Sequence, residues 1–165
     1  MNTVPGTNIP ESATAAPITK SSARLDDEKF TKDAALRGMI EVELGKLAVE
    51  KASRDDVKKF ARKMIDDYTN ANGVLMQVAR KADIQIPGAL DAKHQSRFDK
   101  LSALSGEAFE KAYIHDEVKH CQSEVTGFRA EAQTGGDPVV KAFAAYRLPS
   151  LQEDLKMVKN LGKEH

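Results

Sequence analysis

The sequence predicts an all-α protein whose four main helices pack as a bundle. Hydrophobic residues recur at spacings of three and four along five segments, and no segment alternates polar and apolar residues as a strand would. The 165 residues, 41% hydrophobic and 30% charged, suffice for one domain with its own core. We expect an antiparallel four-helix bundle with a short extra helix between helices two and three and a proline kink in helix four.

The chain divides into a tail and one domain. Residues 1–24 hold three of the six prolines and many Ser, Thr and Ala residues, so we expect a disordered tail there. Residues 25–165 form the single bundle domain. The tail lacks the apolar run of a signal peptide, and no stretch approaches the ~20 apolar residues that cross a bilayer.

The first two main helices are expected at about residues 26–52 and 53–82. Leu36, Ile40 and Leu44 belong to the buried stripe of the first helix, together with Met39 and Leu47. Ser53, followed three residues later by Asp56, has the pattern of a helix cap.

The later helices are bounded by glycine and proline. Pro87-Gly88 ends the second helix, and a short helical piece at 91–101 leads to the third, which starts near residue 105. Gly135-Gly136 is a strong stop signal, and Asp137-Pro138 opens the fourth helix. Pro149 is expected to interrupt that helix by a kink or break near Leu148, with a restart at Ser150.

Several polar residues fall within or beside the apolar stripes, where an unpaired charge would be costly. Each main helix contributes at least one of them. Placing the residues at 100° intervals selects Glu43, Tyr68, Glu117, His120 and Asp154.

These five residues are candidate ligands of a transition-metal ion. Carboxylate-bridged metal centres take Glu from two helices and a Glu-x-x-His pair from each of the other two. This chain has one such pair, Glu117 and His120, so the set is incomplete. The alternatives are a Glu43 paired with a basic neighbour, a hydrogen-bonded core Tyr68 and a boundary His120.

Charge and cysteine content exclude several classes of protein. The formal net charge is +0, from 25 basic and 25 acidic residues, so we expect no nucleic-acid partner. Cys121 is the only cysteine, which excludes an internal disulfide and a Cys-rich zinc site, and it is expected to be a small core residue.

Three stretches together resemble one protein family. They are MIEVELGKLAVEKASRDDVKKFARKMIDDYTNAN (39–72), LSGEAFEKAYIHDEVKHCQSEV (104–125) and LPSLQEDLKMVKNL (148–161). The sequence is similar to domain-of-unknown-function family 4142, a ferritin-like bacterial group, over roughly residues 30–161. The resemblance implies a ferritin-like bundle, usually exported to the bacterial envelope, without a settled activity. Family histidines correspond here to Tyr68, His120 and Asp154, so two of the three are replaced.

Two functions are therefore weighed. The leading hypothesis is a non-catalytic, envelope-associated helical protein, with a stress-related role, that acts by interaction or as a structural module. The alternative is a ferritin-like protein that holds iron, manganese or zinc in its core. The second predicts that the five candidate ligands converge with no Lys or Arg between them. The protein partner, the compartment (periplasm, envelope or cytoplasm) and homo-oligomer formation stay open.

Overall fold

The computed structural model describes residues 21–163, which form five helices and, within that range, no strand. The helices are α1 (Ser22–Lys51), α2 (Asp55–Lys81), α3 (Ala92–Ser102), α4 (Gly106–Thr134) and α5 (Pro138–Lys163). The expected all-α class and the extra short helix are confirmed. Most of the expected tail, residues 1–20, lies outside the described residues. The end of the expected tail was predicted wrongly, because residues 22–24 belong to α1. Ser21 caps this helix by accepting a hydrogen bond from the Arg24 N–H.

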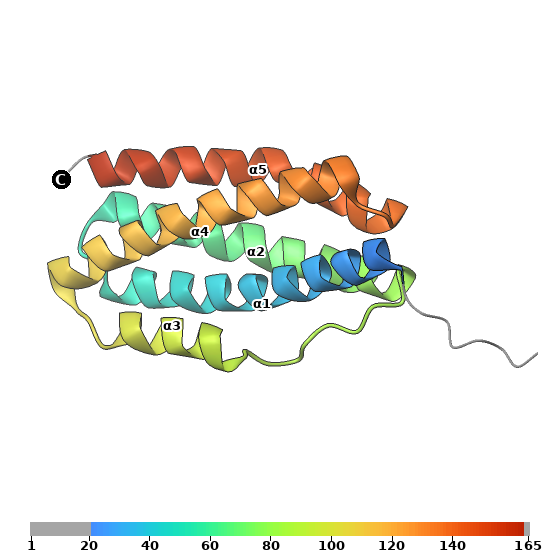
Figure 1. Ribbon diagram of the computed structural model, residues 1–165. Coiled ribbons are helices and arrows are strands. Elements are labelled where there is room, and N and C mark those ends of the chain that lie inside the picture. Colours follow the sequence, from blue (N-terminus) through green and yellow to red (C-terminus); the bar gives the residue numbers. More distant parts are fainter. Residues whose placement is uncertain (1–20, 164–165) are drawn as a thin grey trace, which may run out of the picture.

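Two helical hairpins make the bundle (Figure 1). α1 packs along α2 and α4 packs along α5, while α2 meets α5 and α1 meets α4 to close the bundle. Neighbouring main helices run antiparallel. The chain returns along the outside after α2, and α3 lies on this return beside α1 and α4.

Helix ends follow the sequence signals with two exceptions. α4 ends before Gly135, and Asp137 caps α5, accepting from the N–H of Val139 at 2.8 Å. Ser53 is not the cap of α2, because the N-cap residue is Arg54, whose N–H donates to the side chain of Glu110 from α4. α5 continues through Pro149 without a break, and it changes direction along its length in Figure 1.

Close packing of the first hairpin depends on small residues of α1. A Cβ atom built on Gly38 would meet Asn72 of α2, and one on Gly45 would lie 2.7 Å from Ile65 and 3.1 Å from the Ala61 carbonyl. α1 and α2 therefore approach each other more closely than larger residues would allow. This approach turns one narrow face of α1 inward, on which Glu41 lies.

Aromatic side chains fill both ends of the core. At one end Tyr113 stacks on Phe109 and meets the edge of Phe60. At the other end Phe128 contacts both Phe30 and Phe143. Along α4 the buried Glu117 and Glu124 lie between these two aromatic groups.

Candidate functional site

Four buried glutamates recur every seven residues along α4. They are Glu110, Glu117, Glu124 and Glu131, whose exposed fractions are 3%, 0%, 1% and 7%. A spacing of seven places them on one face, two helical turns apart. We call this set the glutamate series. Because a buried carboxylate needs a partner, the contacts of each member decide what the series can do.

Glu117 shares the guanidinium of Arg97 with two other acids. Arg97, on α3, donates from Nη2 to Glu117 at 3.1 Å and from Nη1 to Glu41 of α1 at 2.7 Å. Its Nε donates to Asp116 at 2.6 Å. We call Glu41, Asp116 and Glu117 the Arg97 pocket. Burial alone would lower the pKa of Arg97, but Glu41 and Glu117 raise it, so the guanidinium stays charged.

Glu117 and Glu41 differ in their protonation state. Burial and the neighbouring Glu41 raise the pKa of Glu117 well above its ordinary value. Burial opposes ionisation of Glu41 as well, yet the neighbouring His120 and Arg97 and a hydrogen bond with Glu117 lower its pKa. Glu117 therefore stays protonated and Glu41 carries the charge that faces Arg97.

His120 lies against the same pocket. Its Nε2 atom is 3.1 Å from Oε1 of Glu41 and 3.7 Å from Oε1 of Glu124. Burial lowers the pKa of His120 to about 4, and Arg97 acts in the same direction. The imidazole is therefore neutral near pH 7.

Glu124 accepts a hydrogen bond from the hydroxyl of Tyr68 of α2. Burial raises the pKa of Glu124 to about 7, although this hydrogen bond acts in the opposite direction. The guanidinium of Arg147 lies over the Tyr68 ring, 5.1 Å from its centroid. Tyr68 and Glu124 thus join α2 to α4 across the core.

Glu110 and Glu131 are the two ends of the glutamate series. Glu110 accepts hydrogen bonds from backbone N–H groups, and Glu131 lies beside an aspartate that does the same. Oε1 of Glu110 accepts from the N–H groups of Ser53 at 2.5 Å and Arg54 at 2.8 Å. At the other end Glu131 lies beside Asp27, which accepts from the N–H of Asp137 at 2.8 Å. Burial and Asp27 raise the pKa of Glu131 to about 8.

Asp154 of α5 belongs to a separate ion pair. Lys63 of α2 lies 2.6 Å from its Oδ1 atom and 2.5 Å from Oδ2 of Asp67. Burial raises the pKa of Asp154 to about 6 in spite of Lys63. Lys63 stays charged, because the two acids outweigh the effect of its own burial on its pKa.

The five predicted ligands do not form one site. Glu117, Asp154 and Tyr68 are buried as predicted, and the His120 side chain is 10% exposed. The inward placement of Glu43 is wrong, because its side chain is 50% exposed and pairs with Lys46 at 3.1 Å.

The predicted convergence without basic neighbours is also wrong. Arg97 lies against Glu117, and Lys63 binds Asp154. Among residues 21–163, no group of three or more His, Cys, Asp or Glu side chains is arranged to hold a metal ion. The predicted ligand set therefore does not fit a carboxylate-bridged centre.

Sequence reasoning missed Glu41, Glu124 and Arg97. A signal for Glu41 exists in the pattern of small residues, because Ala34, Gly38, Gly45 and Ala48 share its narrow buried face. Glu124 follows Glu117 by seven residues, so the same periodicity points to it. No comparable signal marks Arg97, which lies on a short, mostly exposed helix.

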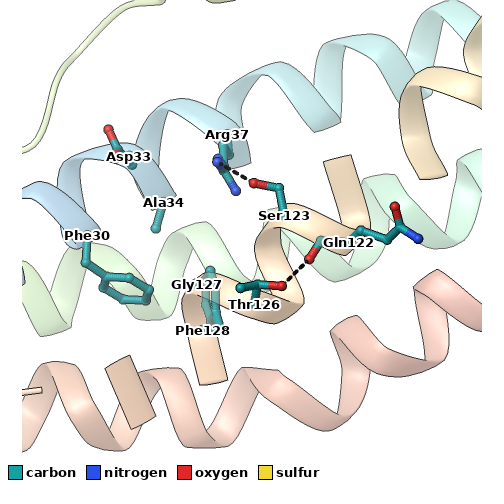
Figure 2. A pocket seen from close by; sticks show the side chains of 9 residues that line it. All are labelled: Phe30, Asp33, Ala34, Arg37, Gln122, Ser123, Thr126, Gly127 and Phe128. Carbon is teal, nitrogen blue, oxygen red and sulfur yellow. Dashed lines mark hydrogen bonds between the residues drawn. The ribbon is translucent and has the colours of Figure 1, made fainter. Parts of the chain in front are cut away.

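A shallow groove runs between α1 and α4 outside the core (Figure 2). It has a volume of 440 Å³ and includes Phe30, Asp33, Arg37, Ser123 and Thr126 in its lining. Nη2 of Arg37 donates to the Ser123 hydroxyl at 3.2 Å across the groove. This half of the seam between the two helices is open, whereas α3 lies along the other half.

Together, the fold and the buried contacts define a class: an all-α bundle whose core acids are bound by groups of the same chain. The chain matches the family model described as "Domain of unknown function (DUF4142)" over residues 10–161. The protein belongs to this family. The comparison with curated proteins finds no match.

A solved structure has the same fold. It is the crystal structure of a protein from Streptomyces coelicolor described as "putative secreted protein DUF305". The TM-score is 0.69 at 17% sequence identity, and the match covers 87% of this chain and 95% of that one. None of the five helices described here is long and apolar enough to span a membrane.

Proposed function

We propose that this protein is a non-catalytic helical-bundle protein of the bacterial envelope that works through contacts with other proteins. The observation that carries this proposal is the state of its buried acids. Arg97 binds Glu41 and Glu117, Lys63 binds Asp154, and the Tyr68 hydroxyl binds Glu124. Acids bonded in this way hold helices together and leave little capacity for an external metal ion.

His120 and Cys121 are the side chains best suited to catalysis, but their pKa values do not suit that role. His120 is buried and neutral near pH 7, and a general base works best with a pKa close to the working pH. Burial raises the pKa of the Cys121 thiol, so the reactive thiolate is suppressed. These two observations support a role without catalysis.

Location in the envelope rests on two likenesses. The resemblance to this family implies export to the bacterial envelope, and the structurally similar Streptomyces protein is described as a putative secreted protein. A net charge of +0 also favours a protein partner over nucleic acid.

Metal loading tests this proposal. The purified protein, free of tag and chelator, is incubated with iron, manganese or zinc and desalted, and its metal content is then measured by inductively coupled plasma mass spectrometry. We expect far less than one metal ion per chain and an unchanged melting temperature. About one ion per chain that disappears in the variant Glu41→Gln/His120→Gln would overturn the proposal in favour of a metal-binding protein.

A further inference from the structure

α3 has few apolar contacts with the bundle. Leu101 is its only fully buried residue, and Phe98 is half-buried against the core. Lys51 of α1 donates to the carbonyl oxygens of Ser102 and Leu104 at its end. The segment 82–91 before it contains Pro87-Gly88 and no helix. Little apolar area is therefore lost when α3 separates from α1 and α4.

The Arg97 pocket has the geometry of a guanidinium receptor. Three carboxyl groups from two helices each face a different nitrogen of one planar group, at 2.6, 2.7 and 3.1 Å. A flat, forked donor fits such a set, whereas a lysine ammonium or a metal ion is a point charge. α1 and α4 thus build a site whose shape and charge suit one chemical group.

The pocket also keeps acceptors that Arg97 does not use. Oε2 of Glu41 and Oε2 of Glu117 receive no hydrogen bond from Arg97, and the two glutamates are hydrogen-bonded to each other. Both glutamates are 1% exposed or less. The hydrogen bond between the two glutamates does not involve Arg97, and their Oε1 atoms face the guanidinium.

The pocket can be reached from outside. A groove of 450 Å³ between α3 and α4 includes Ser96, Arg97, Leu104, His115 and Asp116 in its lining. The Arg97 side chain is 18% exposed, and Asp116 is 31% exposed. An incoming side chain therefore meets Asp116 first and the buried glutamates after Arg97 has withdrawn.

We propose that the Arg97 pocket is a guanidinium-binding site, filled from within the chain by Arg97, in which an arginine of a protein partner replaces Arg97 when α3 moves away. The proposal rests on the proposed function, because it names how such a partner would be held. Charge complementarity selects the occupant, since the pocket presents the acids of Glu41, Asp116 and Glu117 to one forked cation. α3 then acts as a built-in competitor of the partner.

Chemical rescue tests the binding site. Arg97→Ala empties the pocket, and methylguanidinium chloride at about 10 mM serves as the probe, with methylammonium chloride as the control cation. We expect the variant to melt below the wild type and to regain at least half of the lost melting temperature with methylguanidinium alone. The double variant Arg97→Ala/Glu41→Gln, which lacks the charged glutamate of the pocket, should show a weaker rescue, and the wild type none.

Two results would overturn this inference. One is the absence of any rescue, and the other is equal rescue by methylammonium, which would show a general charge effect. Neither result touches the proposed function, which fails separately if wild-type protein retains a stoichiometric metal ion.

Hydrogen exchange on the wild type tests the movement of α3 and does not depend on how the variant folds. We expect the backbone amides of 92–102 to exchange at least ten times faster than those of 113–124 in α4. Methylguanidinium should speed exchange in α3 further, because it competes with Arg97. Equal protection of the two helices, or no response of α3 to methylguanidinium, would contradict the displacement of α3.

Discussion

Tyr68 of α2 donates a hydrogen bond to Oε2 of Glu124 of α4, and both side chains are buried in the middle of the bundle. Burial raises the pKa of Glu124 to about 7, against an ordinary value of 4.5. The folded protein therefore binds this proton more tightly than the unfolded chain does. The contribution of Glu124 to the free energy of unfolding must then fall as the pH rises from about 4.5 through 7.

Glu124→Gln should remove this pH-dependent loss of stability. Each pKa unit corresponds to about 1.4 kcal/mol, so the variant should gain about 3 kcal/mol relative to the wild type between about pH 4.5 and pH 8. Urea unfolding followed by circular dichroism across this range measures the difference. His120, whose pKa of about 4 produces the opposite trend at lower pH, is present in both proteins. Parallel curves for variant and wild type would contradict the prediction, and Glu153→Gln on the exposed face of α5 is the control.

Lys63 is the cation that faces Asp154 and Asp67. Lys63→Met should lower the free energy of unfolding by about 3 kcal/mol at pH 8, because it leaves the buried Asp154 without a cation. The loss should be smaller at about pH 5, where Asp154, with a pKa of about 6, is protonated. Lys59→Met, on the exposed face of the same helix, is the matched control in urea unfolding. A loss that does not vary with pH would show that the ion pair is not its source.

Glu110 caps α2 from another helix. Glu110→Ala should cost about 1–2 kcal/mol of stability, as the loss of a helix cap does, and Glu110→Gln about half as much. Burial alone would raise the pKa of Glu110, but the N–H groups of Arg54 and Ser53 lower it. The contribution is therefore present above its ordinary value of 4.5 and is lost as the pH falls through the lower folded value. Unfolding curves at neutral and acid pH measure this, and an equal effect of Glu110→Gln at both would contradict it.

Two glycines should respond in opposite ways to alanine. Gly45→Ala places a Cβ atom 2.7 Å from Ile65 and should lower the free energy of unfolding by about 1–3 kcal/mol. Gly73 of α2 has no atom within 4 Å of such a Cβ, so Gly73→Ala should raise stability by about 0.5–1 kcal/mol. Thermal unfolding of both variants measures the contrast. A similar shift for the two would show that α1 and α2 do not pack as closely as described.

The fold followed from the sequence because its signals are local. Hydrophobic spacing marked all five helices, and Gly135 and Pro138 marked the turn between α4 and α5. Helix ends that depend on distant residues were not predictable in the same way. Ser53 has the pattern of a cap, but Glu110, which is far away in the sequence, accepts from the N–H groups of Ser53 and Arg54 just before α2.

The candidate site was predicted less well, for physical reasons. The buried face predicted for α1 was defined by its large hydrophobic residues, and this definition placed Glu43 on it. In the structure, the close approach to α2 at Gly38 and Gly45 turns Glu41 inward instead. Small residues bury little area, so they weigh little in such a pattern, although they decide how near two helices come. Arg97 could not be placed because the position of α3 depends on contacts between distant segments.

A double-mutant cycle on Arg97 and Glu41 tests the central claim, that the buried acids are bound by groups of the same chain. Urea unfolding at pH 7 gives the free energies of the wild type, Arg97→Met, Glu41→Gln and the double variant. We predict a coupling energy of about 2 kcal/mol or more, since removing either partner leaves the other group buried and unpaired. A coupling below about 0.5 kcal/mol, the range of independent sites, would contradict the account.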